Sequence, residues 1–233
     1  MVKLSIHHTP RPFAVPLYTV VCTGLVLLTI LLSAPADAQP RVFGPATAPY
    51  GDSLPEWTAD WLRFVFNHTF DDLASEPHCR SSEIHSRVWF ITPLFSPGSA
   101  DVNCELPPGV SLLLPILWAE CSTVEGTPFA CSDETSCRAC AEGFLDGVAG
   151  LSAVIDGTVI DVPRFRFGSP LLSYELPGSN IFGLPDGTPI QSVGDGYYLM
   201  IKPLSVGQHV IHHAGGAPDL GFFNTTVHIR VTP

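Results

Sequence analysis

The grouping of its cysteines constrains this chain more than any other feature of the sequence. Six of the seven cysteines lie between residues 79 and 140, and an even number in an exported chain predicts a disulfide framework, with fifteen connectivities for three bonds. The spacing of Cys137 and Cys140 also fits a redox or zinc CxxC motif, but neither a second CxxC nor a thioredoxin-like βαβ pattern accompanies it. We therefore expect structural disulfides. The candidates are Cys79, Cys104, Cys121, Cys131, Cys137 and Cys140.

The N-terminus predicts the export that such disulfides require. Lys3 and Arg11 give a positively charged start, residues 15–32 are almost entirely apolar, and Ala36 and Ala38 form the small-residue pattern that signal peptidase cleaves. Cleavage after Ala38 would release a secreted or periplasmic protein. The alternative is an uncleaved anchor, because the apolar run approaches the roughly 18 residues that a membrane span needs.

The charge of the chain narrows the classes of partner, and its length narrows the number of domains. The chain carries 22 acidic and 11 basic residues, a net charge of −11, so it lacks the clustered Lys and Arg of a nucleic-acid-binding surface. Anionic membrane surfaces are disfavoured for the same reason, and after signal cleavage we expect no membrane contact. We expect a signal peptide at 1–38, a flexible leader at 39–50 and a single β-rich domain at 51–233.

Two segments predict helices. In the first, residues 53–69, Ser53 and Glu56 form a capping box, and Trp57, Trp61 and Phe64 recur at helical spacing. This aromatic stripe could be a sugar platform, but packing against a sheet is the favoured interpretation. In the second, residues 132–150, Ser132 or Asp133 would cap an alanine-rich helix that ends near Gly147 or Gly150.

Most of the remaining chain predicts short strands. Asp156 and Gly157 join two β runs and are the strongest hairpin signal. Proline interrupts the segments 86–95 and 109–120, so both are expected to be short or to lie at an edge. The last three segments are expected to form a meander. The predicted strand segments are 86–95, 109–120, 152–162, 164–177, 195–204, 207–215 and 220–233. We therefore expect a mainly β fold, an Ig-like or jelly-roll-like β-sandwich with two accessory helices and disulfides.

The motifs D-G-Y-Y-L, P-L and G-Q-H-V-I near the C-terminus, together with the tryptophan-bearing helix and "CELPPGVSLLLPI", carry a family resemblance. They resemble a group of uncharacterised exported bacterial proteins with a D-G-Y-x-L…P-L…G-x-H-x-I pattern. The resemblance covers the chain from about Gly51 onward and implies architecture and export, with no activity. In that group an apolar aromatic residue is common where this chain has His213, which implies that His213 is not a shared metal ligand.

The segment VGQHVIHHAGG, residues 206–216, raises the question of a metal site. Ile211 belongs in the core, which places His209 and His213 on the inward face and His212 on the outward face. The two inward histidines are four residues apart, or about 13 Å along a strand. They are too distant to share one ion unless the strand bulges.

The final strand adds a further histidine. Its apolar residues face the core, so His228 faces outward. Pairing the core faces places Ile211 opposite Thr225 and keeps His228 away from the histidines of the preceding strand. A register slipped by one residue would instead bring His228 to the face of His209, within reach of a shared metal. We expect neither a metal nor another cofactor, and His209 and His228 are the candidates if the slip occurs.

Other catalytic signatures are absent from the sequence: no G-x-S-x-G elbow, H-E-x-x-H, Walker A or dinucleotide motif occurs. Several carboxylates near apolar segments could serve a hydrolase, but caps, turns or solvated charges are the favoured interpretation. Asp195 in particular is interpreted as a turn residue that, with Gly196, precedes a strand. The carboxylate candidates are Asp60, Glu83, Glu120, Asp161 and Asp195.

Two function classes follow. The favoured hypothesis is an exported, non-catalytic β-sandwich that binds a glycan or a protein partner, or serves as a cell-surface structural module. The alternative is a secreted hydrolase with a carboxylate or metal centre on the loops of the sandwich, which a single sequence would not reveal.

Overall fold

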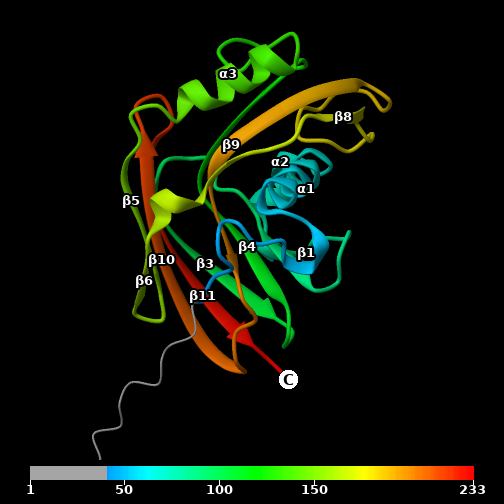
Figure 1. The fold of residues 1–233 in the computed structure, drawn as a ribbon. Helices are drawn as coiled ribbons and strands as arrows, with labels where there is room; N and C mark the ends of the chain where they lie inside the picture. The colour runs from blue at the N-terminus through cyan, green and yellow to red at the C-terminus, as the bar shows by residue number, and fades with distance from the viewer. Residues whose placement is uncertain (1–40) are drawn as a thin grey trace, which may run out of the picture. The chain divides into compact units, whose positions relative to one another are not determined.

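A computed structural model describes residues 41–233, so the predicted signal peptide lies outside the described residues. Two sheets pack against each other (Figure 1). Sheet A contains, in order, β1 (Cys79–Ser81), β2 (Val88–Ile91), β4 (Ser111–Ser122), β9 (Pro189–Ile201) and β7 (Arg166–Gly168), and β8 (Leu172–Glu175) also pairs with β9. Sheet B contains β3 (Gly98–Leu106), β11 (Gly221–Val231), β10 (Gly207–Ala217), β5 (Ala149–Ile155) and β6 (Thr158–Ile160). The predicted mainly β sandwich is confirmed.

Within residues 41–233 three α-helices accompany the sheets, whereas the sequence predicts two. They are α1 (Leu54–Phe66), α2 (Phe70–Ala74) and α3 (Glu134–Phe144), and short 3-10 turns lie at Pro49–Gly51 and Val162–Phe165. The Ser53–Glu56 capping box begins α1, and Asp133 caps α3, as predicted. The helix α2 was missed because five residues are too few to show a helical period.

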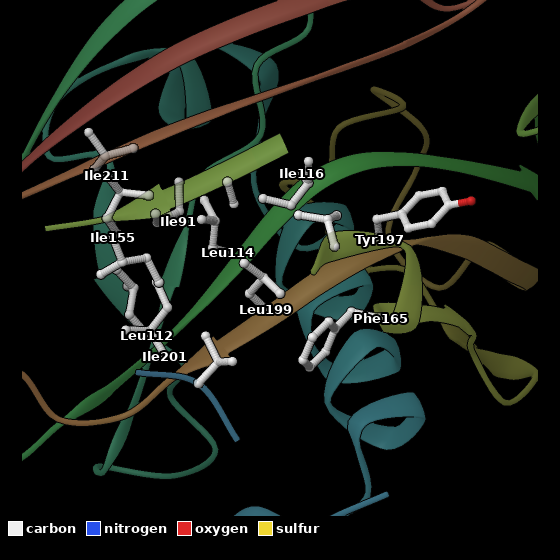
Figure 2. Packing of buried hydrophobic residues seen from close by; sticks show 14 of the residues in the cluster. Ile91, Leu112, Leu114, Ile116, Ile155, Phe165, Tyr197, Leu199, Ile201 and Ile211 are labelled. Atoms are coloured by element: carbon white, nitrogen blue, oxygen red, sulfur yellow. The ribbon is translucent and has the colours of Figure 1, made fainter. Parts of the chain in front are cut away.

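Two apolar cores lie on the two faces of sheet A. The first fills the space between the sheets, where side chains from β4, β9, β5 and β10 meet (Figure 2). The second lies under α1, which covers the face of sheet A turned away from sheet B (Figure 1). Trp57 and Trp61 are fully buried there, and the indole of Trp61 donates a hydrogen bond of 2.8 Å to the carbonyl of Ile91. The packing interpretation of the aromatic stripe is confirmed.

The prediction for the segment 109–120 is wrong about a short strand but right about an edge. The strand β4 is twelve residues long, and β2 pairs with it only at residues 111–113, so within residues 41–233 the part that contains Pro115 has β9 as its only strand partner. An irregularity in the β4–β9 pairing between Pro115 and Leu117 accommodates the proline, which has no N–H to donate. The apolar run is continuous because both faces of the strand are buried. The strand β2 is short, as expected.

The expected C-terminal meander is also wrong. The strand β9 belongs to sheet A, whereas β10 and β11 belong to sheet B, so the chain crosses between the sheets after Ile201. The other neighbour of β11 is β3, which pairs with it in parallel and which is not among the predicted strands. Exposed residues alternate with buried ones along β3, but Gly, Ser, Asp and Asn weaken its β signal.

The pairing of strands that are neighbours in the sequence agrees better with the predictions. The hairpin of β5 and β6 turns at Asp156 and Gly157, whose φ angles of 46° and 77° are those of a two-residue hairpin turn. In the β10–β11 pair Ile211 lies opposite Val227 rather than Thr225. A shift of two residues preserves the faces of both strands, so the inward and outward assignments hold.

Part of the segment that we expected to be a flexible leader, residues 41–43, lies against β9 of sheet A. Val42 forms an antiparallel bridge with Ile201, and the N–H of Phe43 donates a hydrogen bond of 2.9 Å to the carbonyl of Met200. These contacts extend the ordered domain to the N-terminal side of residue 51. No helix within residues 41–233 is long and apolar enough to span a membrane.

All six candidate cysteines form disulfides. Cys79 of β1 bonds to Cys104 of β3 and so links the two sheets. Cys140 of α3 bonds to Cys121 of β4, and Cys131 bonds to Cys137. The two cysteines of the CxxC motif therefore have different partners. Three disulfides fit an extracellular or periplasmic protein.

We expect the three bonds to contribute unequally to stability. The bond of Cys79 and Cys104 closes a sequence separation of 25 and that of Cys131 and Cys137 one of 6, so their loss should cost about 3.5 and about 2 kcal/mol respectively through loop entropy. Urea unfolding of the paired variants Cys79→Ala with Cys104→Ala and Cys131→Ala with Cys137→Ala measures this. Equal losses would contradict the ranking.

Candidate functional site

A cavity of about 600 Å³ lies beside an unpaired edge of β4. The strand β2 pairs with β4 only at residues 111–113, whereas β9 accompanies β4 as far as Ser122. Within residues 41–233, β4 thus has no strand beside its second edge at residues 114–121. Residues 115–120 all line the cavity, and neighbours in a strand point to opposite faces. The cavity therefore reaches both faces of sheet A around this edge.

The walls of the cavity are mostly apolar and come from both cores. Residues of α1 and the 181–182 loop contribute from one side of sheet A, and residues of β3 and β11 contribute from sheet B. Representative wall residues are Val65, Phe66, Val102, Leu117, Phe182 and Phe223. A mostly apolar cavity with a few polar groups is the usual form of a small-molecule site.

Two polar side chains of sheet B face the cavity without a partner. His213 of β10 and Thr225 of β11 are directly opposite each other in the strand pair, and they are 6% and 2% exposed. Neither His213 Nδ1 nor Thr225 Oγ1 has a hydrogen-bond partner. Burial lowers the pKa of His213 to about 4, so the ring is neutral at neutral pH.

A pair of carboxyl groups lines the cavity from sheet A. Glu120 Oε2 accepts a hydrogen bond of 2.6 Å from Ser192 Oγ, and Glu125 Oε2 accepts one of 3.2 Å from Ser122 Oγ. The two carboxyls are within hydrogen-bonding reach of each other, and burial raises the pKa of both, more strongly for Glu120. The pair therefore favours a shared proton over two full negative charges.

Within residues 41–233, the few carboxyl-bearing residues of the cavity wall have no positively charged residue beside them in the wall. Besides the two glutamates, Asp219 lines the cavity, and neither lysine nor arginine is among the lining residues, all of which belong to the described chain. A bound anion would find no opposite charge there.

The histidines proposed as metal candidates lie apart. His209 is buried, with Nδ1 2.7 Å from Asp156 Oδ2 and Nε2 2.8 Å from the carbonyl of Ser205. His228 is exposed and lies 3.4 Å from Asp101. The register places His228 opposite Val210, on the other face from His209. Across residues 41–233 no group of three or more His, Cys, Asp or Glu is arranged to hold a metal.

Among the carboxylate candidates, the interpretation of Asp195 is wrong. It lies inside β9 rather than in a turn, is 3% exposed, and forms an ion pair of 2.6 Å with Arg166 of β7. Asp60 faces Arg63 on α1, and Glu83 and Asp161 are exposed in loops. Only Glu120 lines the cavity.

The amino-acid sequence carries only a weak signal for the polar groups of the cavity. Glu125 lies in a turn after β4, His213 shares the inward face of β10 with His209, and Thr225 is a single polar residue on the apolar inward face of β11. His213 and Thr225 are polar residues on the inward faces of β10 and β11. That was the available signal for a polar site, since a core position usually takes an apolar residue.

We expect His213 to make stability depend on pH. In the unfolded chain its pKa is near the ordinary 6.5 and in the folded chain about 4, so between these values only the unfolded state binds the proton. Stability should therefore fall as pH falls from 6.5 to 4, by on the order of 3 kcal/mol relative to His213→Phe. Urea unfolding of both proteins across this range measures the difference, and parallel pH profiles would contradict it.

We also compared the chain with protein-family models, with curated proteins and with solved structures. None of the three comparisons gives a match.

Proposed function

We propose that this chain is an exported, non-catalytic protein that binds a small apolar molecule in the cavity beside β4. The observation that carries the proposal is the cavity itself, whose volume of about 600 Å³ lies in the 300–1,000 Å³ range of small-molecule sites. Apolar walls supply affinity through burial, and a few polar groups orient the ligand.

The apolar wall favours this ligand over a glycan, which is one of the partners that the sequence leaves open. Sugar sites present exposed aromatic faces and many hydrogen-bonding groups, whereas Trp57 and Trp61 are buried under the helix they belong to. Phe66, Leu117 and Phe223 in the wall would leave a sugar's hydroxyl groups without partners.

Export is the second part of the proposal. The N-terminal pattern of Lys3, Arg11, an apolar run and Ala36–Ala38 supports a cleaved signal peptide. The three disulfides support the same compartment. We propose a secreted or periplasmic protein akin to the exported bacterial group that the C-terminal motifs resemble.

A hydrolase is the second candidate, favoured by one observation: the pair of Glu120 and Glu125, whose proximity and raised pKa values are features of carboxyl pairs that share a proton. The pair is too close for a glycosidase, whose carboxyls are about 5–9.5 Å apart. Glu120 is also buried and bonded to Ser192, which limits the approach of water to it. Binding therefore accounts for the cavity better.

Binding can be tested with the neutral fluorophore N-phenylnaphthylamine. We expect saturable fluorescence enhancement with one probe per disulfide-bonded protein. Ala119→Leu adds three carbons to the cavity wall and should weaken probe affinity by about tenfold or more through lost space. Ala139→Leu, the same change at an exposed position of α3, should leave affinity unchanged.

The second candidate is tested in the same samples. Absence of saturable binding, or equal affinity for both leucine variants, would overturn the binding proposal. Hydrolysis of ester or peptide substrates that Glu125→Gln abolishes would favour the hydrolase instead.

A further inference from the structure

The unpartnered atoms of His213 and Thr225 point to the kind of group that the cavity accepts. More than nine tenths of buried polar groups in proteins have hydrogen-bond partners, yet His213 Nδ1 and Thr225 Oγ1 have none. Opposite residues in a strand pair carry their side chains on one face, with Cβ atoms about 5 Å apart. The two side chains therefore lie beside each other, and both residues line the cavity.

A hydroxyl group suits this pair better than other polar groups. A neutral imidazole Nδ1 either donates or accepts according to its tautomer, and a threonine hydroxyl can do both. A ligand hydroxyl can accept from one of the two side chains while it donates to the other. A carbonyl oxygen can only accept, so it satisfies both side chains only if both donate.

The charge of the wall excludes an anionic headgroup. Glu120, Glu125 and Asp219 line the cavity with no lysine or arginine among the lining residues of the described chain. The His213 ring is neutral at neutral pH because its pKa is lowered. An ionised carboxylate would be desolvated against acidic neighbours and would gain no opposite charge.

We infer that the ligand is an uncharged apolar alcohol, its hydroxyl bonded to His213 and Thr225 and its hydrocarbon body against the apolar wall. This inference rests on the proposed binding function. It assigns His213 and Thr225 as the residues that select the headgroup.

A third unpartnered polar atom provides the control. Tyr198 Oη is buried and has no partner, but Tyr198 is not among the residues that line the cavity. Thr225→Val and Tyr198→Phe each delete one such hydroxyl with little change of shape. Both should raise the Tm of the unliganded protein, since each removes a buried polar group without a partner.

Headgroup selection is measured by displacement of N-phenylnaphthylamine at neutral pH with dodecanol, dodecanoate and dodecylammonium, which share one chain. We expect dodecanol to bind at least tenfold more tightly than dodecanoate. Thr225→Val should weaken the binding of dodecanol by about fivefold to tenfold, measured relative to the affinity of the same variant for the fluorophore. Thr225→Ser, which keeps the hydroxyl, and Tyr198→Phe should retain the wild-type preference.

Each other outcome overturns the inference in a distinguishable way. If dodecanoate binds as tightly as dodecanol, the acidic residues of the cavity wall do not select against an anionic headgroup. If dodecylammonium binds most tightly, Glu120 and Glu125 hold the headgroup instead. If Thr225→Val and Tyr198→Phe behave alike toward dodecanol, the Thr225 hydroxyl does not contact the ligand. Failure of the fluorophore itself to bind would overturn the proposed binding function, whatever the headgroup.

Discussion

The rest of the structure depends on the burial of both faces of sheet A. One face packs against sheet B and the other against α1, so β4 and β9 place apolar side chains on both sides. Along β9, Tyr197 and Leu199 enter the core between the sheets, while Tyr198 and Met200 enter the core under α1. Such a strand loses the alternation of polar and apolar residues that marks a half-buried sheet.

The cavity arises where this arrangement is interrupted. The strand β2 leaves β4 after Leu113, and the next stretch of β4 has a partner on one side only within residues 41–233. At that edge the two cores approach each other, and loops rather than a strand cover the gap. The site is therefore built by the end of one short strand. Its polar groups come from both sheets, which the Cys79–Cys104 disulfide joins.

Local chemistry was predictable where a few neighbouring residues decide it. The Ser53–Glu56 capping box and the turn at Asp156 and Gly157 depend on contacts within a few residues, and both are as predicted. Predictions failed where packing against residues far away in the sequence decides the local structure. The usual preferences of proline and of Asp-Gly predict a short or edge strand at Pro115 and a turn at Asp195. The strand β4 is long, although Pro115 does lie at its unpaired edge, and Asp195 lies inside β9. In the fold an irregular pairing accommodates the proline, and Arg166 compensates the buried carboxylate.

The sequence by itself determined the mainly β class, the use of six cysteines as disulfides, and the faces of β10 and β11, because alternation along a strand and local capping need no knowledge of the partner. Only the tertiary structure decided the sheet to which each strand belongs, the pairing of the cysteines and the cavity. It alone brings Glu120, His213 and Thr225 to one cavity. These features depend on the residue at which each strand ends and on the element that packs beside it. Residues far apart in the chain are brought together only by this packing.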